Sequence, residues 1–482
     1  MENFQYDFLN VLPELTVLGM AMFILLVDLF IKPQNRFVIY GLAQFTLFAA
    51  ALFTFQTHTL GVSYAFNDMF VDDSLGDVLK LMTYLGTSIM LVYTRQYQKQ
   101  RNMFRGEYYA MVLFSMLGMM VMISGQNILT IYMGLELLSL CLYSLVAFDR
   151  DNPRASEAAM KYFVLGALAS GMLLYGMSMV YGMTGSLNIT EIAAEISNIG
   201  LHNPVLIMGL VFVVAGLAFK FGAVPFQMWV PDVYQGSPTS ITLLIGSVPK
   251  FAAFAITIRL LAQGLYPLAA DWQDMLLIMA LLSIIIGNLS AIAQTNLKRM
   301  LAYSTISHIG FLLFGLMSAN LNGFASSMFY ISAYVLMTLA GFGMILLLSR
   351  KGFEADKLDD LKGLNQRSPW AAFLMLITMF SMAGIPPTIG FYAKFTVLQA
   401  AWQAGFTWPV VLAVLMAVIG AFYYLRIVKL MYFDEPLALD PISAPVDMQF
   451  VLSINALALL LIGLLPQTLM NLCGLSIVTS LQ

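Results

Sequence analysis

Cysteine is nearly absent from the 482-residue sequence, which contains only Cys141 and Cys473. Both lie in apolar stretches, and two cysteines cannot supply the four ligands of an iron-sulfur cluster or a zinc site. We expect them to pack as small apolar side chains. The sequence also lacks a Walker phosphate loop and a GxGxxG turn between a strand and a helix. No cofactor and no metal ion is therefore predicted on this chain.

Charge is also scarce, since Asp, Glu, Lys and Arg make up 10% of the residues while apolar residues make up 60%. This balance excludes a soluble globular domain and indicates a polytopic membrane protein. Because about 20 residues cross a bilayer core, the sequence predicts an all-α membrane protein of about fourteen transmembrane helices. They begin near residues 11, 37, 75, 108, 127, 156, 204, 238, 272, 299, 323, 369, 407 and 446.

The distribution of charge predicts the orientation. The amino-terminal stretch MENFQYDF is acidic and lacks the basic residues of a signal peptide, so the first span should be retained. With this end outside, seventeen of the 23 Lys and Arg residues, including Lys298 and Arg299, fall on the cytoplasmic side. The outer connections carry no Lys or Arg, which is the asymmetry of the positive-inside rule. Their acidic residues are Asp68, Asp72, Asp73, Glu191, Glu195 and Asp271.

Six basic residues remain inside predicted spans. Lys80 and Arg259 are near outer ends, where a long side chain can reach the interface. Lys161 follows Glu157 by four residues, which favours an ion pair along a helix, and we leave its role open between structure and function. The other three are Lys220, Lys250 and Lys394, and they are central in their spans. A charge there costs about 2.5 to 3.5 kcal/mol, so we expect these three lysines to be functional.

Few other titratable groups lie at a central position in a predicted span. Glu136 lies in the segment MGLELLSL and His308 in STISHIGFL, whereas His58 and His202 fall in predicted outer connections. A buried histidine is often only a packed core residue, but a mid-membrane histidine near buried lysines favours a proton relay.

Ten of the spans divide into two groups of five. The predicted units are residues 106–265 (spans 4 to 8) and 266–435 (spans 9 to 13), preceded by three helices in 1–105 and followed by one helix in 436–482. An odd number of crossings inverts the second unit relative to the first, as in many secondary transporters. This repeat rests on placement: Glu136 and His308 are in the second helices, and Lys220 and Lys394 are in the fourth.

The fourth helices also carry helix-breaking residues. Pro225 and Pro231 follow Lys220, and the run MAGIPPTIG precedes Lys394, while Pro249 stands beside Lys250 in span 8. Proline removes a backbone donor and clashes with the preceding turn, so these helices should be interrupted in mid-membrane. Free carbonyls at that depth are tolerated only against protein or a water-filled cavity. A lysine at such a break predicts a polar site, although prolines alone would also fit simple kinks.

Buried lysines can relay protons, because desolvation disfavours the ammonium and a nearby carboxylate favours it. If Glu136 approaches and leaves Lys220, or if charge shifts along Lys220, Lys250, His308 and Lys394, each change of partner alters a proton affinity. The sequence therefore predicts a proton path with an electrostatic gate.

Three long segments resemble a known family. FKFGAVPFQMWVPDVYQGSPTSIT, TNLKRMLAYSTISHIGFLL and SMAGIPPTIGFYAKF are similar to the antiporter-like subunits in the membrane arm of respiratory complex I, and the resemblance covers essentially the whole chain. It implies that Glu136, Lys220, Lys250 and Lys394 form a proton channel bridged by His308, and that Lys161 matches a position that commonly carries lysine. It also implies partner subunits that hold flavin, iron-sulfur clusters and quinone, with quinone reduction driving outward proton movement.

Within that family, the chain most resembles the subunit N group of NADH:quinone oxidoreductase. It has no long lateral helix after span 14, and span 12 carries Lys394 where the middle-sized relative is expected to carry glutamate. Animal mitochondrial versions lack the first three helices, so a bacterial inner-membrane protein is favoured. Two alternatives stay open: a subunit of an Mrp-type sodium/proton antiporter, and a membrane scaffold with vestigial charges.

Overall fold

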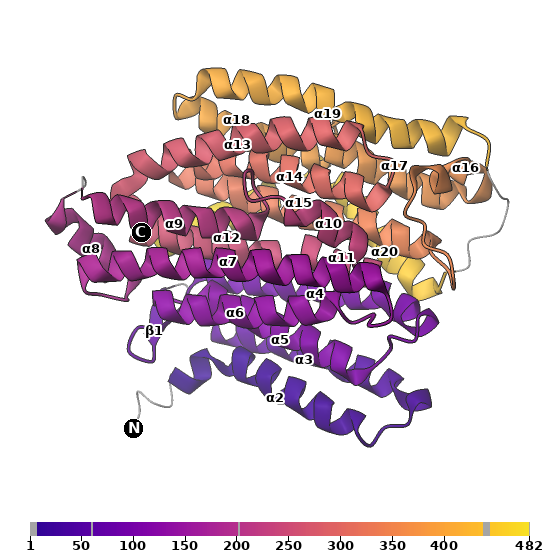
Figure 1. The fold of residues 1–482 in the computed structure, drawn as a ribbon, viewed down its shortest axis with the longest axis horizontal. Coiled ribbons are helices and arrows are strands. Elements are labelled where there is room, and N and C mark those ends of the chain that lie inside the picture. The colour runs from indigo at the N-terminus through magenta and orange to yellow at the C-terminus, as the bar shows by residue number, and fades with distance from the viewer. Residues whose placement is uncertain (1–6, 59–60, 201–202, 437–443, 482) are drawn as a thin grey trace.

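The computed structural model describes residues 7–58, 61–200, 203–436 and 444–481. Most of the acidic amino-terminal stretch, and His202, lie outside these residues. The helices run side by side along one direction, with the first two, α2 (Leu12–Asp28) and α3 (Phe37–Thr57), at one edge of the bundle (Figure 1). Among the described residues, strands are confined to the pair β1 (Ser63–Ala65) and β2 (Phe70–Asp72), which are antiparallel.

Long apolar helices make up the bundle, as the sequence predicts. The uninterrupted helices are α2 (Leu12–Asp28), α3 (Phe37–Thr57), α4 (Ser74–Gln100), α5 (Gly106–Ser124), α6 (Ile128–Val146), α7 (Pro153–Thr184), α13 (Ala269–Ile292), α14 (Leu297–Leu316), α15 (Leu321–Leu348) and α19 (Thr407–Phe433). Short elements are η1 (Pro33–Asn35), α8 (Ile189–Ile199), η3 (Tyr266–Leu268), η4 (Leu358–Leu361) and α16 (Leu364–Arg367).

Other spans are assembled from two or three helical pieces. These are α9 (Pro204–Phe221) with α10 (Trp229–Gly236); α11 (Thr239–Gly246) with α12 (Pro249–Thr257) and the π-helix η2 (Ile258–Gly264); and α17 (Pro369–Ala383) with α18 (Ile389–Gln403). The predicted interruptions at Pro225, at Pro249 and at Pro386 are therefore confirmed. The carboxyl-terminal segment was expected as one helix but forms α20 (Val446–Leu464) and α21 (Gln467–Leu481), because Pro466 cannot continue the first.

The all-α membrane class is confirmed, and a helix begins close to every predicted start. Eleven helices of the described chain are long and apolar enough to cross a membrane. The remaining predicted spans are a 17-residue helix (α2), a helix that carries Lys298, Arg299 and His308 (α14), and the divided pair α17 and α18. The total of fourteen stays a prediction.

The two broken fourth helices end in the same way. Gly222 and Gly384 both adopt a left-handed conformation, with φ of +79° and +85°, which glycine reaches without a steric penalty. Gly222 N–H bonds to Ala218 O, and Gly384 N–H bonds to Phe380 O, each closing a final helical turn. The second helices of the proposed units also begin alike, since Asn127 caps α6 and Asn296 caps α14.

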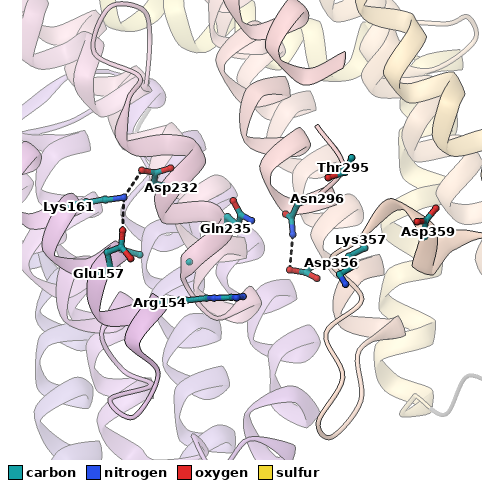
Figure 2. A pocket seen from close by; sticks show the side chains of 12 residues that line it. Arg154, Glu157, Lys161, Asp232, Gln235, Thr295, Asn296, Asp356, Lys357 and Asp359 are labelled. Carbon is teal, nitrogen blue, oxygen red and sulfur yellow. Dashed lines mark hydrogen bonds and ion pairs between the residues drawn. The ribbon is translucent and has the colours of Figure 1, made fainter. Parts of the chain in front are cut away.

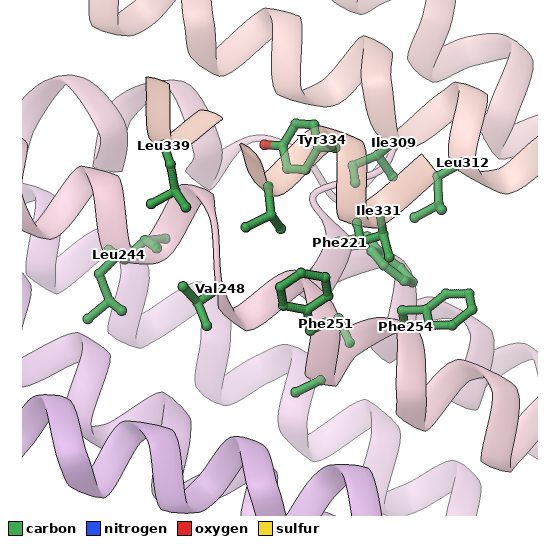
Figure 3. Close-up of a cluster of buried hydrophobic side chains, with 14 of the residues drawn as sticks. Phe221, Leu244, Val248, Phe251, Phe254, Ile309, Leu312, Ile331, Tyr334 and Leu339 are labelled. Carbon is green, nitrogen blue, oxygen red and sulfur yellow. The ribbon is translucent and has the colours of Figure 1, made fainter. Parts of the chain in front are cut away.

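The centre of the molecule is apolar. The segment 239–261 is fully buried, and α15 is nearly so. Figure 3 shows Phe221, Phe251 and Phe254 packed against Ile309 and Ile331, which come from helices of both proposed units. An apolar cluster thus lies where the two proposed units meet.

Candidate functional site

Lys220 lies in the last turn of α9 and is held by two serines of neighbouring helices. Its Nζ donates to Ser139 Oγ at 2.8 Å and reaches Ser170 Oγ at 3.5 Å. Ser139 lies one turn beyond Glu136 on α6, and Ser170 is on α7. The ammonium is therefore placed where three helices meet, as expected for a central rather than a snorkelling lysine.

Glu136 is half-buried on α6, and its Oε1 is buried without a hydrogen-bond partner among the described residues. Among the described residues, no ion pair within 4.0 Å joins Glu136 to Lys220. The polar group of α6 that Lys220 contacts is Ser139 Oγ. A buried carboxylate oxygen without a donor is costly. This arrangement leaves Glu136 able to gain a partner when Lys220 moves.

Lys250 closes the end of the helix that carries Lys220. Its side chain is 2% exposed, and Nζ donates to Phe221 O at 2.8 Å and to Lys220 O at 3.2 Å. These carbonyls lack partners within α9 because the helix ends there. A cation at a helix carboxyl terminus also faces the negative end of the helix dipole.

Two further lysines bind helix ends in the same way. Lys394 Nζ donates to Met382 O at 2.9 Å and to Ala383 O at 3.0 Å, the last residues of α17. Lys298 Nζ donates at 2.6 Å to Ser237 O, directly after α10. The carbonyls freed by the breaks are thus satisfied by ammonium groups, and Lys298, expected in a cytoplasmic connection, is instead 2% exposed.

His308 is enclosed by tyrosines. Nδ1 is 2.7 Å from the hydroxyl of Tyr330, and Nε2 is 3.1 Å from that of Tyr424. A cavity of about 10 Å³, the size of one water, lies beside His308 and also touches Met382, whose carbonyl binds Lys394. One small cavity therefore lies between His308 and the helix break that Lys394 closes.

Tyr334 spans part of the apolar centre. Its hydroxyl oxygen lies 3.0 Å from Gly246 O and 2.9 Å from Thr305 Oγ1, joining the break of span 8 to the helix that carries His308. The His308 and Tyr334 rings are 5.6 Å apart between centroids. This tyrosine is the polar group that sequence reasoning missed between Lys250 and His308, because its position depends on how α15 crosses α11.

An open cavity of about 630 Å³ lies between α7, α10 and the beginning of α14, and Figure 2 shows the side chains that line it. Lys161 Nζ lies 2.8 Å from Glu157 and 2.9 Å from Asp232, so the expected helical ion pair is confirmed and a second carboxylate is added. Asp232 also binds Arg299 at 2.7 Å. The lining includes Arg154, from a connection predicted to be cytoplasmic, which places the cavity mouth at that end.

The predictions for Lys80 and Arg259 were wrong. Lys80 and Arg259 were expected to reach the outer interface, but each is 1% exposed. Lys80 pairs with Glu14 at 2.7 Å, and Arg259 pairs with Asp73 at 2.7 Å. Neither partner is near in sequence, so spacing along a helix gave no sign of these buried ion pairs. Both cysteines are free, with Cys473 buried and Cys141 partly buried.

Comparison with known proteins gives one family. A family profile described as "NADH:quinone oxidoreductase/Mrp antiporter, TM" matches residues 125–420. A protein of Methylovorus glucosotrophus named NADH-quinone oxidoreductase subunit N is 68% identical over 483 residues, covering 100% of both chains. A protein of the same name from Thioalkalivibrio sulfidiphilus is 56% identical and covers 97% of each.

Solved structures agree on the fold. A chain of respiratory complex I from Thermus thermophilus, solved with bound aureothin, is similar with a TM-score of 0.82 at 30% identity, covering 95% of this chain and 98% of that one. A chain of the Mrp complex from Dietzia sp. DQ12-45-1b has a TM-score of 0.85 and covers 99% of this chain and 98% of that one. Its identity is 20%, so it shows a shared fold alone.

Proposed function

Because the chain belongs to the family of NADH-quinone oxidoreductase subunit N, antiporter-like membrane subunits of respiratory complex I, we propose that it carries protons across the membrane, coupled to quinone reduction in partner subunits. The observation that carries this proposal is the contact of Lys250 with the backbone carbonyl of Lys220. Two lysines at one helix break form a site where a proton on one ammonium alters the proton affinity of the other.

The route begins at the open cavity beside Lys161 and Asp232, which lies at the predicted cytoplasmic end. From there the break between α10 and α9 leads to Lys250 and Lys220. Glu136, with its unpartnered oxygen, attracts the Lys220 ammonium when the serine contacts break. Such a change of partner is the electrostatic gate.

The second half of the route leads from Lys250 through Tyr334 to His308 and Lys394. Tyr334 joins the span 8 break to the helix of His308, and the small cavity beside His308 reaches the break that Lys394 closes. Direct contacts are absent between Lys250 and His308 among the described residues, so one or more waters complete this step.

Two inverted five-helix units, 106–265 and 266–435, organise this route. The matching glycine-ended breaks and the matching asparagine caps support the division. Asn127 pairs with Asn188 and Asn296 pairs with Lys357, each in an antiparallel bridge at the same separation along the chain. We assign the protein to a bacterial inner membrane, with its amino terminus outside.

The test is proton pumping by the intact complex in sealed vesicles. We expect Glu136→Gln and Lys220→Ala to lower both pumping and coupled quinone reduction by about tenfold or more, since proton relays contribute rate factors of this order. Glu195→Gln and Lys429→Ala, at exposed positions, are the matched controls. Unchanged pumping in the first two variants, with assembly intact, would refute this path.

An Mrp-type sodium/proton antiporter is the second candidate, supported by fold alone. Affinity purification in mild detergent separates the two. NADH:quinone reductase activity that co-purifies with the chain, and that a quinone-site inhibitor blocks, places it in complex I. Purification with flavin-free membrane subunits and sodium-driven proton exchange would overturn that assignment.

A further inference from the structure

A second group of buried charges lies outside the route, at the other end of the bundle. It comprises Glu14, His58, Asp72, Asp77 and Lys80, and we call it the outer cluster. Its residues come from α2, the end of α3, β2 and α4. Strand β1 and the start of α4 lie at the end of the bundle that carries α8, which is the predicted outer end (Figure 1). The family profile, which begins at residue 125, does not include these residues.

Lys80 and Glu14 satisfy each other's charge. Their ion pair measures 2.7 Å, and the side chains are 1% and 8% exposed. The ammonium also lies 4.8 Å from the centre of the Phe70 ring. The Lys80 ammonium is therefore paired with the Glu14 carboxylate, which leaves Asp72 and Asp77 without a permanent positive partner in the cluster.

Asp72 and Asp77 face each other in a buried place. Each is 3% exposed, and Asp72 Oδ2 and Asp77 Oδ1 have no donor among the described residues. Burial and the charge of Asp77 raise the pKa of the Asp72 carboxyl, so the two buried groups interact. Ionised carboxylates only accept hydrogen bonds, so a hydrogen bond between the two groups would place a proton on one of them. Two like charges this close cannot both be ionised at low cost.

We propose that the Asp72 and Asp77 carboxyl groups hold one exchangeable proton and that His58 passes it to the outer water, which makes the outer cluster the proton-release site of this subunit. The outward direction rests on the proposed function. The presence of the shared proton does not, because it is a property of the resting protein.

His58 is the exchange group because, among the described residues bonded to the pair, it is the one with an exposed side chain. Its Nδ1 lies 2.7 Å from Asp77 Oδ2, and its side chain is 38% exposed whereas that of Asp77 is 3% exposed. A proton leaving the carboxyl pair moves through Asp77 to Nδ1, and Nε2 loses a proton to water. The imidazole then returns to its neutral form, and the pair is left as two carboxylates until a proton refills it.

The environment of Asp72 suits exchange near neutral pH. Burial, followed by the nearby charge of Asp77, raises the pKa of this carboxyl to about 7, although the ammonium of Lys80 opposes the rise. Glu14, within the cluster, also faces Asp72, and Tyr84, which bonds to Thr54, faces the cluster from α4. At such a pKa the carboxyl is half protonated in neutral water, so it can both take up and release a proton.

Asp73, the residue after Asp72, joins the outer cluster to the lysine route. Asp73 follows Asp72 and forms a two-point ion pair with Arg259, with distances of 2.7 and 2.8 Å. Arg259 lies on η2, in the same span as Lys250. A shift of that span therefore moves the charge next to the Asp72 and Asp77 pair.

Infrared difference spectroscopy of the resting, intact complex tests the shared proton. Between about pH 6 and pH 8 we expect a protonated-carboxyl absorption to disappear, and ¹³C-labelled aspartate should shift it. Asp72→Asn removes this absorption, because asparagine donates to Asp77 without an exchangeable acid proton. Asp68→Asn, at an exposed position, should leave it unchanged. A wild-type spectrum without an aspartic acid absorption in this range overturns the proposal even if the variant does not assemble.

His58→Gln tests the exchange step. The absorption should remain, while its response to a jump in pH slows by about tenfold or more, since proton transfer by a positioned side chain contributes at this scale. An unchanged response assigns the release to another group and overturns the role of His58. No turnover is needed, so these outcomes are separate from a loss of pumping in Glu136→Gln.

Discussion

Lys250, Lys298 and Lys394 share one task at the residue scale, since each donates to carbonyls that a broken helix leaves free. Buried ammonium groups are costly in hydrocarbon, and unpaired buried carbonyls are costly too. Placing one against the other reduces both costs. The proposed proton route uses two of these ammonium groups, Lys250 and Lys394, so the helix-end bonds and the proposed proton transfer involve the same atoms.

Lys220 differs, because its partners are serine hydroxyls rather than helix-end carbonyls. We expect Lys220→Arg to lower pumping by about tenfold or more although the charge is kept, because guanidinium stays protonated and cannot relay a proton. Proton movement in sealed vesicles measures this, with quinone reduction in uncoupled membranes as the control. Full pumping in the arginine variant would show that a fixed charge suffices at this position.

Sequence reasoning identified most polar groups of the candidate site but few of their partners. Lys220, Lys250 and Lys394 stand out because a lysine in an apolar span is rare. Lys298 does not, since it adjoins Arg299 and looks like part of a cytoplasmic connection. Tyr334 carries no signal in a sequence rich in tyrosine, and its role depends on the crossing of two helices.

At the scale of elements, the α17 and α18 break is packed against the divided carboxyl-terminal segment, α20 and α21. The backbone of Gly463, near the end of α20, is so close to Pro387 and Thr388 that a methyl group at this position would collide with their backbone atoms. Since Lys394 is bonded to the end of α17, this contact fixes the position of the break around the lysine.

Gly463→Ala is therefore expected to destabilise the folded subunit by about 1 to 3 kcal/mol, the usual cost of overpacking, and to lower pumping. Thermal inactivation of the complex and proton pumping measure the two effects. Gly474→Ala is the matched control, because open space surrounds that position on α21. Equal thermal inactivation and equal proton pumping in Gly463→Ala and Gly474→Ala would mean that the α17 and α18 break does not depend on the α20 contact.

The positions of the breaks were predictable from proline and glycine, but their contacts were not. The division of the carboxyl-terminal segment at Pro466 shows the limit, because a single proline can kink a helix or end it. Which outcome occurs depends on the neighbours that the two pieces find, here α15, α17 and α18 for α20, and α15 and α4 for α21.

At the scale of the whole molecule, the Asp73 and Arg259 pair joins distant parts of the chain. Arg259 also approaches Ile123 O at the end of α5, and Ser480 of α21 accepts from Leu75 N–H. Burial alone would raise the pKa of Asp73, but the Arg259 charge and hydrogen bonds hold that pKa below its usual value. The stabilisation from this carboxylate is therefore present above about pH 4 and is lost as the pH falls through the lowered pKa.

Arg259→Met should destabilise the subunit by about 3 to 5 kcal/mol, because it leaves a buried carboxylate without its cation. Adding Asp73→Asn should restore part of the loss. Denaturant unfolding of the purified complex measures both, with Arg150→Met at an exposed position as the control. If the double variant is no more stable than the single one, the two residues do not act as a pair.

The sequence predicted the class, the helix starts and the family resemblance, because each depends on long apolar runs and extended motifs. It did not predict the ion pairs that join the first three helices to one another and to span 8. Those partners are separated by tens to hundreds of residues, and only the packed bundle brings them together.

The bonds from Lys250 to the end of α9 have one more consequence. Loss of the proton from this lysine, as the proposed route requires, would remove the positive charge that faces the helix terminus while leaving two N–H donors, so its bonds to the last turn of α9 would weaken. The charge of Lys250 and the order of the backbone at the end of α9 are therefore expected to change together. Amide hydrogen exchange at Gly222 and Ala223 can report proton occupancy inside the membrane without a dye, an electrode or a mutation.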